Sequence, residues 1–182
     1  MVLQRLPMIK VVLDEYQRLI AEQYGIQRAK NFIPHFEGKT NTNYAQRNYG
    51  GDFEQFINRQ ILGVAAEIVV ADYFGLTDFT PLNDVYKTQA DVGTNVEVKY
   101  THLMTGNLLV RKNDRDDDYC VLVIGDIEAF YIVGWIPVKE AKTEVNSKHH
   151  LPGCYLVPHA ELRPMDHLEM IGDTAYERVH TL

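Results

Sequence analysis

The residues of this sequence that could do chemistry gather in the segment ADVGTNVEVKY, residues 90–100. Within it, Val96 and Val98 alternate with Glu97 and Lys99. Successive side chains of a β-strand point to opposite faces, so the two valines would face one way and the two charged side chains the other. We therefore expect a strand with one apolar face and one charged face.

The position of Asp91 relative to this strand depends on the loop before it. If residues 93–95 form a three-residue hairpin loop, Asp91 lies opposite Glu97 and on the same face. Asn95 tolerates the left-handed conformation that such a loop favours at its third position. A two-residue loop would instead place Asp91 opposite Val98 and turn its carboxylate away from the charged face.

Two carboxylates and an ammonium on one face of a sheet could hold a hard divalent cation. Mg²⁺ takes oxygen ligands, so Asp91 and Glu97 could share one ion with the backbone carbonyl of Val98. Mn²⁺ is expected to substitute. Lys99 could orient an attacking water or neutralise charge in the transition state. Without metal, carboxylates about 5 Å apart repel by roughly 3 kcal/mol at an effective dielectric of 20, so stability alone does not explain them.

A further acid, Glu67, interrupts an apolar stretch, ILGVAAEIVVADYF, that is predicted to be a helix buried on most faces. Together these residues resemble the pattern of the PD-(D/E)XK nuclease superfamily, over roughly residues 60–136. The pattern consists of Glu67 within GVAAE, then Asp91, and then Glu97-Val98-Lys99. Ala90 stands where the motif name has proline, which many members lack.

The resemblance implies a restriction-endonuclease-like αβββαβ core, a mixed four-stranded sheet flanked by helices. It implies a Mg²⁺-dependent DNA endonuclease, phage-like or from a restriction or repair system, that leaves 5′-phosphate and 3′-hydroxyl ends. Its catalytic residues would be Glu67, Asp91, Glu97 and Lys99, with Glu67 reaching the metal directly or through water. Cutting both strands would favour a homodimer. The alternatives are a catalytically silent nucleic-acid-binding or interaction module and a structure-selective junction or flap nuclease.

The elements expected to position these residues form an α/β domain, with helices first and a strand-rich half after them. The first helix would cover residues 9–24 and be closed by Gly25, and residues 26–51 would form a long loop. The second helix would run from Asp52 to Phe74, with a break near Gln60. Strands are predicted near 84–92, 95–101, 107–111, 119–125, 130–136 and 155–157, with a helix over 137–146. Residues 1–51 would be a helical extension of a nuclease-like domain over 52–182, within one compact unit.

Bulk composition limits the class of protein. The 182 residues carry a net charge of −7, which argues mildly against a protein that coats nucleic acid. No apolar run approaches the roughly 20 residues that cross a bilayer, and the start lacks a secretory signal. Two cysteines, Cys120 and Cys154, are too few for a disulfide framework and are expected to be buried thiols. We therefore expect a cytoplasmic protein.

Several other residues have both a functional and an ordinary interpretation. Gln89 and His102 could contact substrate or lie on the surface, and Lys39 and Arg47, in a loop with Tyr44 and Tyr49, could bind nucleic acid or belong to a surface connection. Zinc binding in the HHLPGCYLVPH segment is not expected from its spacing, which favours solvated histidines and a buried cysteine. The acidic run 114–118 is predicted to be a solvated turn, and Trp135 a core or interface residue. The zinc candidates are His149, His150, Cys154 and His159.

Overall fold

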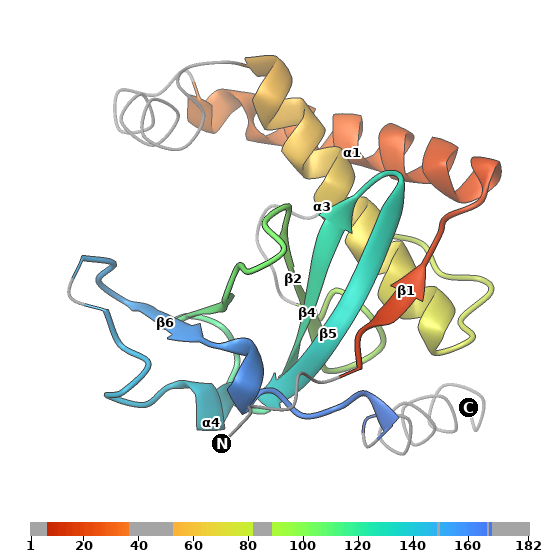
Figure 1. Cartoon of the computed structure of the whole chain (residues 1–182). Helices are drawn as coiled ribbons and strands as arrows, with labels where there is room; N and C mark the ends of the chain where they lie inside the picture. The colour runs from red at the N-terminus through yellow and green to blue at the C-terminus, as the bar shows by residue number, and fades with distance from the viewer. Residues whose placement is uncertain (1–6, 37–52, 82–88, 149, 167, 169–182) are drawn as a thin grey trace, which may run out of the picture.

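The computed structural model describes residues 7–36, 53–81, 89–148, 150–166 and 168 (Figure 1). The loop cations Lys39 and Arg47 and most of the strand predicted over 84–92 lie outside these residues. The elements are β1 (Ile9–Val11), α1 (Glu15–Phe36), α3 (Phe53–Tyr73), β2 (Val96–Thr101), β3 (Leu108–Arg111), β4 (Tyr119–Asp126), β5 (Ala129–Pro137), α4 (Val138–Ala141), β6 (Cys154–Val157) and the 3₁₀ helix η1 (His159–Glu161).

The predicted α/β class is confirmed by a mixed four-stranded sheet with helices. The strand order is β1-β5-β4-β2, in which β2 pairs with β4 in parallel and the other neighbours are antiparallel. β2 therefore forms one edge of this sheet. A separate two-stranded antiparallel sheet contains β3 and β6. The N-terminal segment contributes β1 to the main sheet, so it is joined to the strands that follow.

The first helix differs from the prediction at both ends. Residues 9–11 form strand β1, and α1 begins at Glu15 and continues past Gly25 to Phe36. Gly25 does not close the helix because it serves the packing of α1 on α3. A Cβ atom at Gly25 would lie 2.4 Å from the Cα of Ile61, so only glycine allows this close approach. The predicted break of the second helix near Gln60 is also wrong, since α3 is continuous.

The two faces of the main sheet are covered by different elements. α3 packs on one face, with α1 lying across it (Figure 1), and the core there includes Val64 of α3 with Val98 and Val121. On the other face, Cys120 and Leu122 pack against a second cluster that includes residues of β3, β6 and α4. The two faces of β2, at the edge of the sheet, therefore contact different core clusters.

The helix predicted over 137–146 is shorter, because α4 ends at Ala141. The amide side chain of Asn146, which is buried, donates a hydrogen bond to the Ala141 carbonyl at 3.1 Å. A side chain that satisfies a helix-terminal carbonyl replaces the next backbone turn, which ends the helix there. Trp135 lies in the core at 3% exposure, as predicted. No helix in the described part of the chain is long and apolar enough to span a membrane.

Candidate active site

Of the two loop lengths that the sequence leaves open, the hairpin before β2 has the three-residue loop. Val92 and Val96 form an isolated antiparallel bridge, with hydrogen bonds of 3.0 and 3.2 Å in the two directions. This register places Asp91 across from Glu97. The left-handed position of the loop is Gly93, at φ 59°, and not Asn95 as predicted. Glycine adopts this conformation at lower cost than asparagine, which accounts for the difference.

Asp91 lies at the open edge of β2, where its carboxylate takes the place of a neighbouring strand. The backbone N–H of Val98 donates to Oδ2 of Asp91 at 2.9 Å. Asn95 accepts from Tyr119 of β4, so the alternate residues Val96 and Val98 direct their backbone groups away from β4. In a strand the N–H and C=O of one residue point to the same side. The Val98 carbonyl is therefore directed to the same edge as Asp91.

Glu97 and Lys99 project from β2 toward the face that carries the second core cluster. Their partners in the parallel register are Cys120 and Leu122, which belong to that cluster. The Lys99 ammonium lies 3.5 Å from Glu97 and 2.8 Å from Asp114. Glu97 is 4% exposed, so a buried carboxylate and a largely buried ammonium share this position.

The acidic run 114–118 is a turn between strands, as predicted, and residues 115–117 are exposed, but the two acids at its ends are not solvated. The Asp114 side chain is 12% exposed and holds Lys99, and Asp118 is 3% exposed. Arg115 binds both carboxylate oxygens of Asp118, at 2.7 and 2.8 Å. The prediction missed these two acids because Asp114 meets Lys99 of β2 and Asp118 meets Arg115 of the turn itself. Lys142 fixes this turn by donating to the carbonyls of Lys112 and Asp114.

Glu67 on α3 is bound by Arg28 of α1. Two guanidinium nitrogens donate to its two carboxylate oxygens at 2.7 and 2.8 Å, and the side chains are 5% and 12% exposed. Burial alone would lower the pKa of Arg28, but the hydrogen bonds and charge of Glu67, together with the charge of Asp91, leave it raised. Because Asp91 acts on this pKa, the Arg28–Glu67 pair and the Asp91 carboxylate belong to one charged group of residues.

Buried acids in the described part of the chain coincide with the residues singled out from sequence. Four acidic side chains there are buried, and three of them are predicted site residues: Glu67, Asp91 and Glu97, with Asp118 as the fourth. Burying a carboxylate is costly, so such residues are frequent at functional sites. No three His, Cys, Asp or Glu side chains among the described residues lie close enough to hold a metal ion. The three-carboxylate ligand set therefore stays a prediction.

Two carboxylates and one backbone carbonyl remain as a chemically suitable set for Mg²⁺. The carboxylates of Asp91 and Glu97 belong to residues opposite each other in the hairpin register, and the carbonyl of Val98 is directed to the edge where Asp91 lies. All are hard oxygen donors, and Mg²⁺ commonly binds one or two carboxylates while it retains waters. These residues therefore fit the metal that the resemblance implies.

The remaining candidates separate into residues near this region and residues apart from it. His102 and Gln89 are exposed, and His102 lines a pocket beside Glu67. In the zinc candidate segment, His159 contacts the carbonyl of Gly106 at 2.8 Å and His150 is exposed, while His149 lies outside the described residues. Cys120 is buried as predicted, but Cys154, at the start of edge strand β6, is only partly buried.

Sequence reasoning missed Arg28, Asp114 and Arg59. Arg28 lies on the part of α1 that was predicted to be loop, and Asp114 belongs to an acidic run that resembles an ordinary turn. No local pattern marks Arg28 as the partner of a buried acid. Its position four residues after Tyr24 becomes informative only once the helix is known to continue past Gly25. No protein-family model, curated protein or solved structure matches this chain.

Proposed function

We propose that this protein is a metal-dependent DNA endonuclease of the PD-(D/E)XK type, with a restriction-endonuclease-like core. The observation that carries the proposal is the Val92–Val96 bridge, which sets Asp91 across from Glu97 at the edge of β2. Burial of both carboxylates supports it, because an acid pair withdrawn from water without a chemical use would lower stability. Mg²⁺, when bound, would stabilise developing negative charge and acidify a bound water.

The residues of the chain have distinct roles in this proposal. Asp91 and Glu97 would hold the cation, with the Val98 carbonyl as a further ligand. Lys99 would orient the attacking water or neutralise charge on the phosphate. Asp114, which contacts the Lys99 ammonium at 2.8 Å, would act as a positioning residue for it. Glu67 would support the site through its pairing with Arg28, whose charge interacts with Asp91.

One observation favours a second candidate, a catalytically silent nucleic-acid-binding module. Both oxygens of Glu67 accept hydrogen bonds from Arg28, so a metal at Glu67 would compete with a guanidinium or use the remaining lone pairs. A protein that only binds nucleic acid does not need the Glu67 carboxylate to be available to a metal. The presence of Asp91, Glu97 and Lys99 together argues for hydrolysis over this alternative.

A cleavage assay separates the two candidates. Purified protein is incubated with supercoiled plasmid and either Mg²⁺ or Mn²⁺, and linear and branched DNA are tested in parallel. We expect nicking or linearisation that EDTA stops. Asp91→Asn, Glu97→Gln and Lys99→Ala should each lower the rate about 1,000-fold, because each removes several kcal/mol of transition-state stabilisation. Asp126→Asn, at an exposed position on β4, is the matched control and should retain full activity.

The opposite results are equally clear. If wild-type protein leaves every DNA form intact with both metals but still binds DNA, the silent module is the correct function. If cleavage persists in all three site variants, the activity does not belong to this site.

A further inference from the structure

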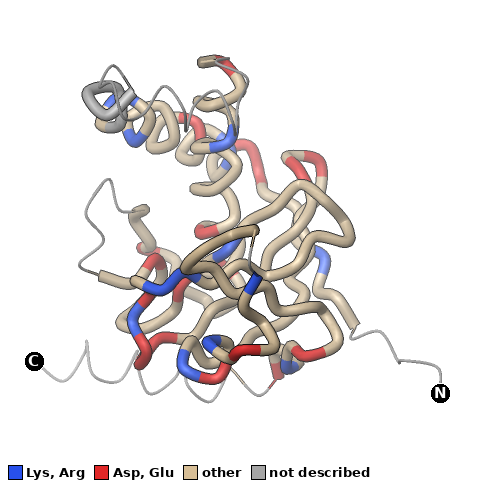
Figure 2. Tube along the Cα trace, turned by 90° about the vertical axis from the view of Figure 1, so that its left-hand side faces the viewer, with Lys and Arg blue, Asp and Glu red and all other residues tan. Residues whose placement is uncertain are grey.

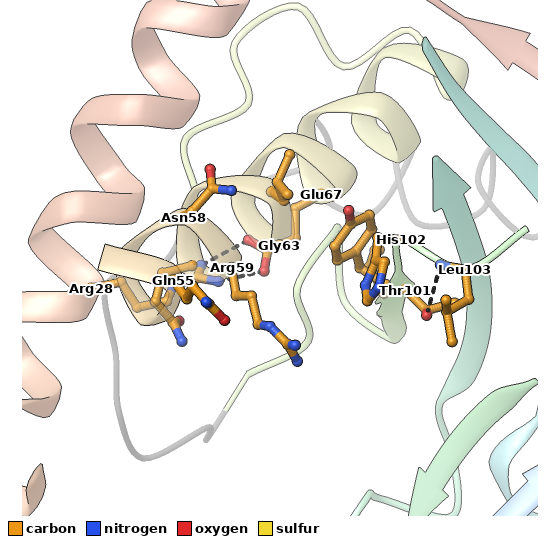
Figure 3. Close-up of a pocket in the computed structure, with 13 residues that line it drawn as sticks. Arg28, Gln55, Asn58, Arg59, Gly63, Glu67, Thr101, His102 and Leu103 are labelled. Atoms are coloured by element: carbon orange, nitrogen blue, oxygen red, sulfur yellow. Dashed lines mark hydrogen bonds and ion pairs between the residues drawn. The ribbon is translucent and has the colours of Figure 1, made fainter. Parts of the chain in front are cut away.

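A pocket of about 830 Å³ opens beside Glu67, between α3 and the end of β2 (Figure 3). Figure 3 shows Gln55 and Arg59 of α3 on one side and His102, directly after β2, on the other. Val98 and Tyr100 also line the pocket. Its volume is within the range of pockets that bind small molecules or nucleotide-sized groups.

The polar lining of this pocket favours an anion. It includes two arginines, one histidine and three side-chain amides, and Glu67 is the one acid among the described residues that line it. That acid already accepts two hydrogen bonds from Arg28. The lining groups are Arg28, Arg59, His102, Gln55, Asn58 and Gln60.

Overall charge does not mark this region. Acidic and basic residues are interspersed along the described trace (Figure 2), and the chain is acidic in total. A local excess of cations and amide donors inside a pocket can still recognise phosphate oxygens, because short-range hydrogen bonds outweigh screened distant charges. The pocket therefore indicates a phosphate ligand although the net charge does not.

Val98 links this pocket to Asp91, although Asp91, Glu97 and Lys99 are not among the residues that line it. Val98 lines the pocket, and its backbone N–H is the donor to Asp91. Arg28, which also lines the pocket, experiences the charge of Asp91. A chain of phosphates that passes through the pocket would reach the edge of β2 where Asp91 lies.

We propose that this pocket binds a nucleic-acid strand through its phosphodiester groups, next to the phosphate that is cut. Arg59 and His102 are the phosphate-binding side chains, and Gln55 and Asn58 donate hydrogen bonds to phosphate or base edges. The hydroxyl of Tyr100 donates to the Gly125 carbonyl at 2.9 Å, which holds its ring as a fixed wall. This inference rests on the proposed function for the position of the cut, but strand binding does not require cleavage.

Binding is measured apart from cleavage, by fluorescence anisotropy of a labelled 12-nucleotide DNA strand in EDTA. Arg59→Ala and His102→Ala alter exposed side chains and should fold normally. Arg59→Ala should raise Kd about tenfold and reduce the slope of log Kd against log salt by about 0.7, as loss of one single-strand phosphate contact predicts. His102→Ala should raise Kd about threefold, because it removes a hydrogen-bond donor to phosphate. Lys139→Ala removes the same charge at an exposed position of α4 and should leave Kd unchanged.

Further arms identify the ligand. RNA of the same sequence and a DNA duplex are tested with the same variants, and inorganic phosphate is added as competitor at constant ionic strength. The proposal is supported if Arg59→Ala lowers the affinity for the nucleic-acid strand and free phosphate does not compete for the same binding. It is overturned if Arg59→Ala and Lys139→Ala change Kd equally, or if free phosphate displaces the strand completely at millimolar concentration. If wild-type protein cleaves DNA but Arg59→Ala leaves Kd unchanged, strand binding in the pocket is overturned and the nuclease proposal stands. If Arg59→Ala raises Kd but wild-type protein does not cleave, only the nuclease proposal is overturned.

Discussion

Two buried acid–base groups lie on opposite sides of strand β2, and they differ in how fully the cation binds the acid. On the α3 side, Arg28 binds both oxygens of Glu67 at 2.7 and 2.8 Å. On the other side, Lys99 is 3.5 Å from Glu97 and closer to Asp114, at 2.8 Å. The first arrangement is a planar, bidentate pair, whereas the second divides a single ammonium between two acids.

The difference separates a structural arrangement from a chemical one. A bidentate guanidinium pair satisfies the acid and fixes two helices, because the five donors of arginine match a carboxylate in fixed geometry. Glu97 instead shares the Lys99 ammonium with Asp114, and its charge also acts on Arg115, so single-point contacts replace the bidentate pair. From this contrast we expect Glu67 to contribute more to stability and Glu97 more to activity.

The largest expected effect is on stability, from Glu67→Gln. This change leaves Arg28 buried with a weaker partner and should lower the free energy of unfolding by about 3 kcal/mol, as breaking a buried ion pair does. Glu97→Gln should change it by less than about 1 kcal/mol, because Asp114 still holds Lys99. Urea unfolding followed by circular dichroism measures both.

The double variant Arg28→Met with Glu67→Leu provides the control. It removes both charges together and should be more stable than Glu67→Gln alone. Equal loss of stability in Glu67→Gln and Glu97→Gln would mean that the two groups do not differ in the way described.

A smaller effect is expected from Asp114→Asn, on activity. Without its main carboxylate, the Lys99 ammonium loses its fixed position, and the cleavage rate constant kcat should fall about tenfold with KM within about twofold. Asp114→Glu should restore part of the rate, since a carboxylate is again present. Asp117→Asn, at an exposed position of the same turn, is the control and should be neutral. A rise in KM without loss of kcat would assign Asp114 to substrate binding instead.

The last expected effect is a loss of stability in alkali, which reports both sides of β2. Burial raises the pKa of Cys120, on the Glu97 side, to about 12. Burial and the charge of Asp126 raise the pKa of Tyr100, on the α3 side, to about 12. The unfolded chain loses these protons near pH 8.5 and 10, whereas the folded chain keeps them. The contribution of these two protonated groups to the free energy of unfolding is therefore fully present below pH 8.5 and is lost as the pH rises toward 12.

Urea midpoints at pH 8, 9 and 10 test this dependence. Each group contributes at most about 1.4 kcal/mol per pH unit within its range. Cys120→Ala should flatten the decline between pH 9 and 10, where the tyrosine contributes little. An unchanged slope in that variant would show that the Cys120 side of the sheet admits water.

Much of the site could be predicted from sequence because its pattern is local. The alternation of valines with Glu97 and Lys99 predicts the two faces of β2. A three-residue loop over 93–95, which sets Asp91 opposite Glu97, was one of the two loop lengths that the sequence allowed. Strands β3, β4, β5 and β6 were also found within a residue or two, since short apolar runs between turn residues mark them. These features depend on neighbouring residues only.

Features that depend on distant contacts were not predictable in the same way. Glu67 was singled out, but its partner Arg28 lies 39 residues away and on a helix whose extent depends on the packing of Gly25. The low exposure of Asp114 was not predicted because it depends on Lys99, which comes from another element.

The sequence by itself determined the acids and the strand that presents them, because side-chain periodicity acts over a few positions, and it left two hairpin registers open. Only the tertiary structure decided which cation meets which acid, and that a pocket lined by Arg59 and His102 opens beside Glu67. Ion pairing and pocket shape arise where elements far apart in the chain pack together, and no local pattern specifies that packing.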